Sequence, residues 1–329
     1  MAQPWEPEIE FTRERARALI EAQFPELCPV ALVDYGKGWD NLAYLVNEEW
    51  VFRFPQRELA GQTMAGELAA LRHLPRPLPL EVPQPAFVGA PDGDYPYAFS
   101  GYRELQGRTA CSLELSAAAR ARCAPRLGAF LAALHGSEAT EAMQREVHGD
   151  RIRRADLGYR LGQLEARFDE LEALGVPTGP PISDASPADA AAANSIARAA
   201  SRLDVPALRA LARETGEAPP WPHAPRLVHG DLYARHVLLD DSLTACGVID
   251  WGDAHLGDPA LDLSIAFAFL PESARGSFFE AYGDVDEATL RRARFRALVY
   301  GAALVQYGLS VGDAPLGRAG LYAFESALV

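Results

Sequence analysis

The 329 residues of the chain are enough for one large domain or for two lobes that share a cleft. Hydrophobic residues make up 49% and charged residues 23%, which is typical of a soluble globular protein. The formal net charge of −14 argues against a nucleic-acid partner, because a phosphate backbone must be neutralised by Lys and Arg. The same charge would attract a cationic small molecule, although an acidic surface that only maintains solubility explains it equally well.

The four cysteines are scattered and form no C-x-x-C pair, so neither a zinc site nor a thioredoxin-like site is indicated. Such sparse cysteines are typical of a reducing compartment. Residues 1–11 lack the basic start and apolar core of a signal peptide, and the apolar run 265–270 is far too short to cross a bilayer. We therefore expect a cytoplasmic protein without a membrane partner.

Hydrophobic spacing predicts helices and short strands in the first third of the chain and mainly helices afterwards. The first group comprises a helix over 9–23, strands over 30–35, 41–47 and 50–54, a helix over 66–74 and an extended run over 86–88. The later helices are expected over 127–135, 156–174, 188–200 and 205–215 and within 290–329. Before the second of these, Asp150 is a possible helix N-cap.

Two β-favouring runs in the second half end in or lead into a carboxylate. Asp231 and Asp250 are 250 − 231 = 19 positions apart, so a hairpin-like return can bring both to one cleft. His236, five residues after Asp231, is able to bind a metal ion. Two facing carboxylates with such a side chain suit Mg²⁺-assisted phosphoryl transfer, in which one orients the attacking hydroxyl and the other holds the metal.

These residues resemble the catalytic and metal-binding loops of the aminoglycoside phosphotransferase family, antibiotic kinases that share the protein-kinase fold. Protein kinases have H-R-D-x-x-x-x-N and D-F-G at these places. This chain has H-G-D-L-Y-A-R-H from His229 to His236 and D-W-G from Asp250. His236 replaces the usual Asn, which is similar to the aminoglycoside 2″-kinases and macrolide kinases and differs from the 3′-kinases.

The resemblance covers about residues 30–270 and is strongest over 226–263. It implies an α+β fold with two lobes, a β-rich N-terminal lobe and a mostly helical C-terminal lobe. The nucleotide-binding lobe is expected over 1–104 and ends at the hinge. The catalytic and substrate-binding lobe is expected over 105–329, with a helical insertion over about 150–222.

The resemblance also implies where the nucleotide binds. Arg53 would contact the α- and β-phosphates, and Glu67 would pair with it as the αC glutamate of kinases does. The strand over 97–107 would lead into the hinge, where Arg103 and Leu105 present backbone groups to the purine and Tyr102 is the gatekeeper. A bulky gatekeeper favours guanine, so we expect GTP as well as ATP as donor. An edge-strand arginine, a solvated glutamate and a core tyrosine are the simpler alternatives.

By the same resemblance, Asp231 orients the substrate hydroxyl and accepts its proton, and Asp250 binds Mg²⁺. His236 would ligate a second Mg²⁺ directly or through a water molecule, and the water-mediated contact suits this hard cation better. Asp262 would brace the backbone of the catalytic loop, and His229 belongs to the same supporting layer.

Three further acidic residues are candidates for substrate contact. Asp253 would approach the metal or a substrate amine. Glu165 and Asp169 lie on one face of the predicted 156–174 helix, and helices in this region supply acidic groups to ammonium-bearing substrates in the family's antibiotic kinases. For each of them a solvated helix face is the simpler alternative. His255 is expected to be exposed or to form a local hydrogen bond.

We therefore expect an O-phosphotransferase that moves the γ-phosphoryl group to a hydroxyl of a small, cationic molecule, first of all an aminoglycoside or macrolide antibiotic. The alternative is a metabolic kinase acting on choline, homoserine or a sugar. A nucleotide-binding pseudokinase is disfavoured, because Asp231, Asp250 and a basic strand residue are all present. A monomer or weak dimer is expected.

Overall fold

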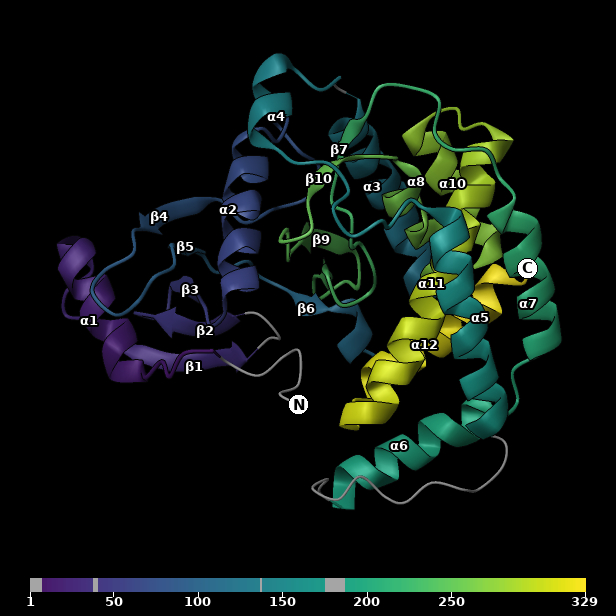
Figure 1. The fold of residues 1–329 in the computed structure, drawn as a ribbon, viewed down its shortest axis with the longest axis horizontal. Helices are drawn as coiled ribbons and strands as arrows, with labels where there is room; N and C mark the ends of the chain where they lie inside the picture. Colours follow the sequence, from purple (N-terminus) through teal and green to yellow (C-terminus); the bar gives the residue numbers. More distant parts are fainter. Residues whose placement is uncertain (1–7, 38–40, 137, 175–186) are drawn as a thin grey trace.

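The computed structural model describes residues 8–37, 41–136, 138–174 and 187–329. Its N-terminal part is a five-stranded antiparallel sheet with the strand order β1-β2-β3-β5-β4, accompanied by two helices (Figure 1). The elements are α1 Arg13–Gln23, the 3-10 turn η1 Pro25–Leu27, β1 Leu32–Lys37, β2 Asn41–Val46, β3 Trp50–Pro55, α2 Glu58–Arg72, β4 Pro85–Gly89 and β5 Phe99–Arg103.

The C-terminal part is mainly helical and carries two small antiparallel sheets, ordered β6-β8-β9 and β10-β7. The strands are β6 Arg108–Thr109, β7 Arg226–Val228, β8 Val237–Leu239, β9 Ala245–Val248 and β10 His255–Gly257. The helices are η2 Ala110–Ser112, α3 Ala117–His135, α4 Glu141–Glu146, α5 Leu157–Leu174, α6 Pro187–Ala200, α7 Val205–Gly216, α8 Ala260–Leu263, α9 Ile265–Ala268, α10 Glu272–Tyr282, α11 Glu287–Val311 and α12 Ala314–Ala327. The predicted α+β class, β-rich first and helical afterwards, is confirmed.

Side-chain caps fix two helix starts that hydrophobic spacing placed differently. The Thr12 hydroxyl accepts a hydrogen bond from the Arg15 backbone N–H at 3.2 Å, so α1 begins at Arg13 and not at residue 9. Asp156 caps α5 by accepting from the Tyr159 N–H at 2.9 Å. Asp150 accepts instead from the Ala155 N–H, before the helix begins, so its prediction as the cap of this helix was wrong.

Two hydrophobic clusters form the core. The smaller one joins α1 to the face of the five-stranded sheet opposite Arg53 and is rich in aromatic rings, including Phe52, Phe54 and Phe99. The larger one holds the helical part together and also includes the end of α2 and the buried Leu80. Figure 1 accordingly shows α2 between the sheet and the helical part. The packing therefore ties α2 to both parts, and the boundary at residue 104 stays a prediction.

Helices α11 and α12 approach each other closely through glycines. A Cβ atom added at Gly308 would lie 2.7 Å from the backbone nitrogen of Gly317, and one added at Gly320 would lie 2.8 Å from the Gly301 carbonyl oxygen. These contacts involve backbone atoms, which cannot rotate away as a side chain can. The close approach matters to the candidate site, because α11 carries side chains that contact Asp231. Among the helices of the described ranges, none is both long and apolar enough to span a membrane.

We expect Gly308→Val to lower the free energy of unfolding by about 2 kcal/mol, because the added methyl groups must push α12 away from α11. Urea unfolding followed by circular dichroism measures the difference. The control is Gly276→Ala on α10, where no atom lies within 4 Å of an added Cβ. Alanine at this exposed helical position should stabilise the protein by about 0.5–1 kcal/mol. Equal stability of the two variants would contradict this account of the interface.

Candidate active site

The loop of residues 229–236 joins β7 to β8 and carries Asp231. It turns sharply at Gly230, whose φ is 79°. A Cβ atom there would lie 2.5 Å from the backbone oxygen of Asp253, so only glycine fits this turn. The backbone of the loop is thereby held against residues 253–255, which lead into β10.

A fully buried carboxylate holds the start of this loop. Asp262 on α8 accepts hydrogen bonds from the backbone N–H groups of His229 and Gly230, at 2.7 and 2.8 Å, and lies 3.1 Å from His135 Nε2. His229 Nε2 lies 3.0 Å from the Ile249 carbonyl oxygen and must donate to it, so its Nδ1 is free to accept from the Asp231 N–H. These bonds tie the Asp231 loop to the segment that precedes Asp250.

Asp250 follows β9 in a left-handed backbone conformation, with φ at 64°. Such a conformation is uncommon for a residue with a side chain, although Asp tolerates it better than most. It places the half-exposed carboxylate 3.4 Å from Arg53 Nη2 and 3.4 Å from His236 Nε2. Next to it, Trp251 is fully buried and packs against the His229 ring, which anchors the loop.

The orientation of His236 indicates a place for a cation. Its Nδ1 lies 2.7 Å from the backbone oxygen of Asp231, and because a carbonyl only accepts, Nδ1 must carry the proton. Nε2 then faces the Asp250 carboxylate, and a cation shared by the two, either a proton on Nε2 or a metal ion, would stabilise this arrangement.

This donor set fits Mg²⁺ only as part of a larger site. No group of three or more His, Cys, Asp or Glu side chains within the described ranges is arranged to hold a metal ion. Mg²⁺ in kinases is commonly held by one or two carboxylates, with phosphate oxygens and waters as the other ligands. Asp250 and His236 therefore fit a site that a nucleotide would complete.

Asp231 lies among groups that sequence reasoning missed. Its Oδ1 accepts a hydrogen bond from the Tyr300 hydroxyl at 3.2 Å, and Arg154 Nη2 and Arg296 Nη2 lie at 3.4 and 3.6 Å. Burial raises the pKa of Asp231, but Arg154, His236 and Arg296 outweigh it and hold that pKa below its usual value. The carboxylate is thus ionised near neutral pH and able to accept a hydrogen bond from a hydroxyl.

The pKa values of the two neighbouring carboxylates, Asp250 and Asp253, are shifted in opposite directions. His236 and Arg53 overcome the desolvation of Asp250 and lower its pKa. Burial raises the pKa of Asp253, and the nearby negative charges of Asp231 and Asp250 add to this effect against the attraction of Arg154. Asp253 lies 2.6 Å from Arg154 Nη2. The structure therefore brings Asp253 close to Asp231 through a shared arginine.

Arg53 on β3 and Glu67 on α2 form a buried ion pair, with Nη1 and Oε1 2.5 Å apart. Burial lowers the pKa of Arg53, but the negative charges of Glu67 and Asp250 outweigh this effect and raise the pKa above its usual value. The guanidinium group therefore stays charged. The pair aims one guanidinium edge at Asp250, which is the geometry expected of a phosphate-binding cation.

We expect Arg53→Gln to raise the nucleotide KM at least tenfold, because a buried cation beside the phosphate position is lost. Glu67→Gln should have a smaller effect in the same direction, since the guanidinium keeps its charge but loses its orientation. Steady-state kinetics with varied nucleotide measures both. Arg72→Gln on the exposed part of α2 is the matched control. An unchanged KM in Arg53→Gln would contradict the phosphate contact.

The predicted purine-binding residues lie at the end of β5. Tyr102 is half-buried, and burial raises the pKa of its hydroxyl. The Arg103 side chain points to Glu49, 2.5 Å away, and over the Trp50 ring, so only its backbone is available to a purine. Leu105 lies against Gly247 of β9, where an added Cβ would come within 3.4 Å of it. The three residues thus connect the sheet to the β8–β9 hairpin.

Glu165 and Asp169 are not joined to the Asp231 cluster. Both form ion pairs with Arg209 of α7, and Glu165 also binds Arg213 at 2.8 Å. Two guanidinium groups thus pair with three carboxylates, since Glu172 also binds Arg209, and a substrate contact there stays a prediction. His255 forms the expected local bond, to the Asp253 backbone oxygen at 2.8 Å, but it is buried and not exposed.

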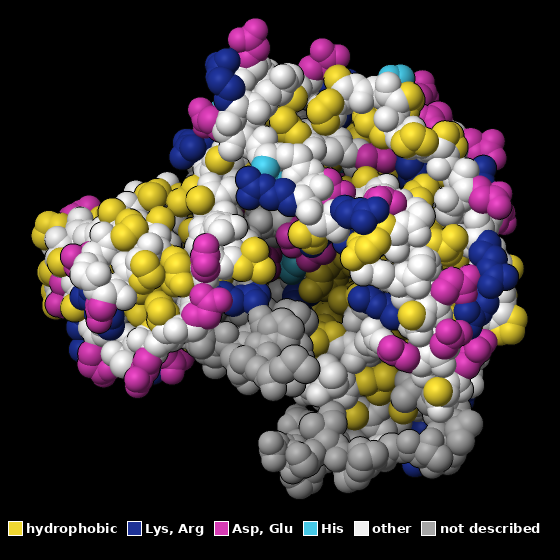
Figure 2. Space-filling model, viewed as in Figure 1, with side chains coloured by type: hydrophobic (Ala, Val, Ile, Leu, Met, Phe, Trp, Pro, Cys, Tyr) yellow, Lys and Arg dark blue, Asp and Glu magenta, His cyan; other side chains and the backbone are white. Residues whose placement is uncertain are grey.

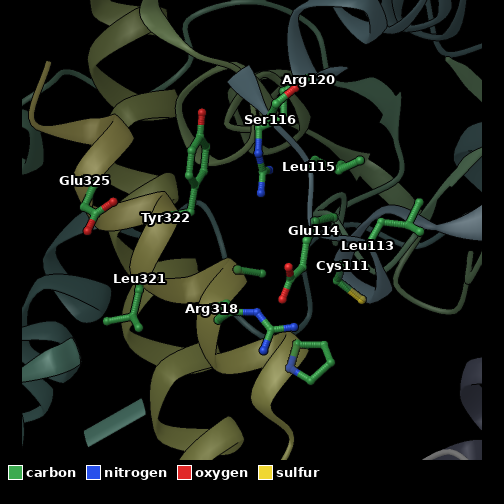
Figure 3. Close-up of a pocket in the computed structure, with 13 residues that line it drawn as sticks. Cys111, Leu113, Glu114, Leu115, Ser116, Arg120, Arg318, Leu321, Tyr322 and Glu325 are labelled. Carbon is green, nitrogen blue, oxygen red and sulfur yellow. The ribbon is translucent and has the colours of Figure 1, made fainter. Parts of the chain in front are cut away.

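The structure has a hollow between its two parts and a separate pocket on the helical part. Figure 2 shows the molecule hollowed between the sheet-containing part and the helical part, with Lys or Arg, Asp or Glu and His side chains around the hollow. A separate pocket of about 420 Å³ lies between η2 with the start of α3 and one face of α12 (Figure 3). Glu114, Arg120, Arg318 and Tyr322 are among its lining residues, and none of the predicted site residues is. The pocket is therefore distinct from the carboxylate cluster.

Comparisons with known proteins identify the family and the fold of the chain. The chain matches the phosphotransferase enzyme family over residues 32–296. Its structure resembles an aminoglycoside 2″-phosphotransferase in complex with GDP and kanamycin, at a TM-score of 0.63 and 23% identity over 96% of this chain and 98% of that one. It also resembles the macrolide 2′-phosphotransferase MphH of Brachybacterium faecium, at a TM-score of 0.55 and 20% identity over 94% of this chain and 97% of that one.

A curated relative adds only a short match. YcbJ of Bacillus subtilis (strain 168), an uncharacterised protein, is 34% identical over 62 residues, which span 19% of this chain and 20% of that protein. The solved structures confirm the predicted kinase-like fold. The match to the family extends from β1 into α11 and so includes Arg53, Asp231 and Asp250. The predicted kind of enzyme is thereby confirmed at the level of the family, and the chain belongs to the phosphotransferase enzyme family.

Proposed function

We propose that the protein transfers the γ-phosphoryl group of a nucleoside triphosphate to a hydroxyl group of a small molecule. The observation that carries this proposal is that Asp250 connects the Arg53–Glu67 ion pair to the loop that carries Asp231. Asp250 is shared between the Arg53–Glu67 pair on one side and His236 on the other, and Asp231 lies next to His236. A phosphate-binding cation, a metal-binding carboxylate and a hydroxyl-binding carboxylate thus line one cleft, which is what phosphoryl transfer requires.

In the proposed reaction the acceptor hydroxyl donates a hydrogen bond to Asp231, which orients its oxygen towards the γ-phosphorus. The new O–P bond forms as the bond to the β–γ bridging oxygen breaks, and the electron pair of that bond leaves with the nucleoside diphosphate. Asp231 takes the hydroxyl proton late, because the loose transition state needs little base strength. Arg53 holds the phosphates of the leaving group.

Asp250 is the residue that would hold Mg²⁺, with His236 as a second ligand directly or through water. When bound, the ion would neutralise charge on the phosphate oxygens. The donor we propose is GTP or ATP. A GDP complex of one related 2″-phosphotransferase and a streptomycin–ATP complex of another support both nucleotides. Tyr102 at the end of β5 supports GTP, and an ATP preference of tenfold or more in kcat/KM would contradict that role.

Two acceptor classes are proposed. Related structures contain kanamycin and gentamicin, which supports a hydroxylated antibiotic. A hydroxylated metabolite is the second candidate, and one observation favours it. The acidic residues that would bind an antibiotic ammonium group, Glu165 and Asp169, are paired with Arg209.

The test is a turnover screen of the purified protein with Mg²⁺ and either ATP or GTP. The acceptor panel spans aminoglycosides, macrolides, choline, homoserine and sugars, and nucleoside diphosphate release is measured. We expect release that depends on one acceptor class and is lost in Asp231→Asn. Tight nucleotide binding without turnover on any acceptor would contradict the proposed function and favour a pseudokinase.

A further inference from the structure

The acceptor side of the catalytic carboxylate is basic. Arg154, just before α5, and Arg296, on α11, both point a guanidinium group at Asp231 Oδ1. Neither of them contacts Asp250 in any of the described ion pairs, whereas Arg53 does. The two arginines therefore lie on the side of Asp231 away from the phosphate-binding pair, where an acceptor would bind.

Both arginines are buried, and Arg296 is the less completely paired of the two, because Arg154 also binds Asp253 at 2.6 Å. Arg154 is 9% and Arg296 7% exposed, and among the described residues the Nε atom of neither has a hydrogen-bond partner. Asp231 is the only carboxylate that forms a described ion pair with Arg296, at 3.6 Å, beyond hydrogen-bonding distance. The guanidinium otherwise stacks over the Tyr300 ring, 4.1 Å from its centroid. A buried cation with so little compensation is costly unless a further anion binds it.

Two further arginines, on α5, interact electrostatically with this pair. Arg160 and Arg167 are seven positions apart on α5 and so share one helix face. Burial and the charges of Arg296 and Arg154 lower the pKa of Arg160, and burial together with Arg296 lowers that of Arg167, against the attraction of Glu170. Arg296 thus repels both Arg160 and Arg167, and Arg154 repels Arg160, so an anion bound next to Arg296 would relieve part of this repulsion.

We propose that the acceptor carries an anionic group, a carboxylate or a phosphate ester, and that Arg154 and Arg296 bind this group beside the hydroxyl held by Asp231. This inference rests on the proposed phosphotransferase function and specifies its substrate class. It replaces the cationic acceptor expected from the sequence. A guanidinium pair recognises carboxylate and phosphate oxygens through directed hydrogen bonds. An ammonium group there would be attracted by Asp231 and Asp253 but repelled by both guanidinium groups, which already pair with these carboxylates.

The experiment compares acceptors that share a scaffold and differ in charge. One series is glucose, glucosamine, gluconate and glucose 6-phosphate. The other is glycerol, serinol, glycerate and glycerol 3-phosphate. We expect kcat/KM for an anionic member to exceed that of its neutral and cationic counterparts at least tenfold. Gluconate and glycerate test a carboxylate, and the two phosphate esters test a phosphate. A preference for glucosamine, serinol or an aminoglycoside would overturn the inference and leave the phosphotransferase function intact.

Variants separate acceptor binding from catalysis. Arg296→Gln should raise the KM of the anionic acceptor at least tenfold with a smaller change in kcat, and Arg296→Lys should recover part of the loss. Arg145→Gln, whose side chain is 70% exposed, is the matched control. A fall in kcat of equal size for charged and neutral acceptors would show that Arg296 acts on the transferred phosphoryl group, and would overturn the inference.

Binding decides the inference if no member of either series is turned over. Gluconate and glycerol 3-phosphate are titrated calorimetrically into protein saturated with Mg²⁺ and a non-hydrolysable GTP analogue, so that the γ-phosphate position is filled. Saturable binding that weakens at least tenfold in Arg296→Gln, and is unchanged in Arg145→Gln, would support the anionic acceptor. Absence of binding by both probes would overturn it. Failure of the protein to bind the nucleotide analogue would instead count against the proposed function itself.

Discussion

Replacing Asp231 with Asn is expected to reduce kcat by about 10³-fold while the nucleotide Kd changes less than threefold. Asn keeps the size of the side chain and one acceptor oxygen, so the hydrogen bond from Tyr300 can persist. It loses the negative charge that orients the hydroxyl and receives its proton. In the proposed site, Arg53 and Asp250 hold the nucleotide on the other side of the cleft, so nucleotide binding should survive the substitution. Single-turnover kinetics and nucleotide titration measure the two effects.

Asp241→Asn is the control for this variant. Asp241 is exposed in the turn after β8, ten residues along the chain from Asp231. Its replacement by Asn is the same chemical change at a position away from the site. We expect it to keep full activity. If Asp231→Asn retained activity within tenfold of the wild type, Asp231 would not be the residue that orients the acceptor, and the assignment of the cleft would be wrong.

The local part of the candidate site was readable from the sequence because it lies on one hairpin. Asp231, His236 and Asp250 flank β8 and β9, and antiparallel pairing of Val237 with Val248 brings the ends of these strands together. A spacing of 19 residues between two carboxylates therefore carries geometric information. Arg53 and Glu67 required the family resemblance, because nothing in a lone Arg or a helical Glu indicates that the two will meet.

The acceptor side could not be predicted in the same way. Tyr300 and Arg296 lie one turn apart on α11 and reach Asp231 across 69 and 65 positions, so only tertiary packing defines the contact. In the sequence, residues 151–154 resemble a charged surface stretch, although Arg154 becomes buried. Helical spacing did place Glu165 and Asp169 on one face. It did not indicate that Arg209 of α7 would cover that face.

Helix ends illustrate the same limit. Hydrophobic spacing identified the helix that became α2 but placed its start at residue 66, because it relied on the leucines of its second half. The structure begins α2 at Glu58, and the buried Ala60 and Met64 extend the inward face by two turns. Alanine and methionine are weak signals in a periodic pattern, since both also occur at exposed helical positions.

Asp262→Ala is expected to have the largest effect on stability, a loss of about 3 kcal/mol in the free energy of unfolding. The carboxylate is fully buried and binds two backbone N–H groups and His135, so its removal leaves three buried polar groups unpaired. Activity should fall as well, because the freed backbone carries Asp231. Chemical denaturation measures the first effect. Asp204→Asn at the exposed start of α7 is the control, since Asn caps a helix as well as Asp does.

The same carboxylate predicts how stability depends on pH. Burial alone would raise the pKa of Asp262, but the bonds from His135 and the nearby His229 lower it below the unfolded value of about 3.9. The unfolded chain therefore binds the proton more readily, so the contribution of Asp262 is complete above that unfolded value and is lost as the pH falls through the lower folded pKa. Asp262→Asn should remove this part of the acid sensitivity. The difference in the free energy of unfolding between wild type and variant should therefore narrow from pH 6 to pH 3. A gap that stays constant over this range would show that Asp262 is not ionised in the native protein. Asp262 would then have to accept its hydrogen bonds as a neutral carboxyl group.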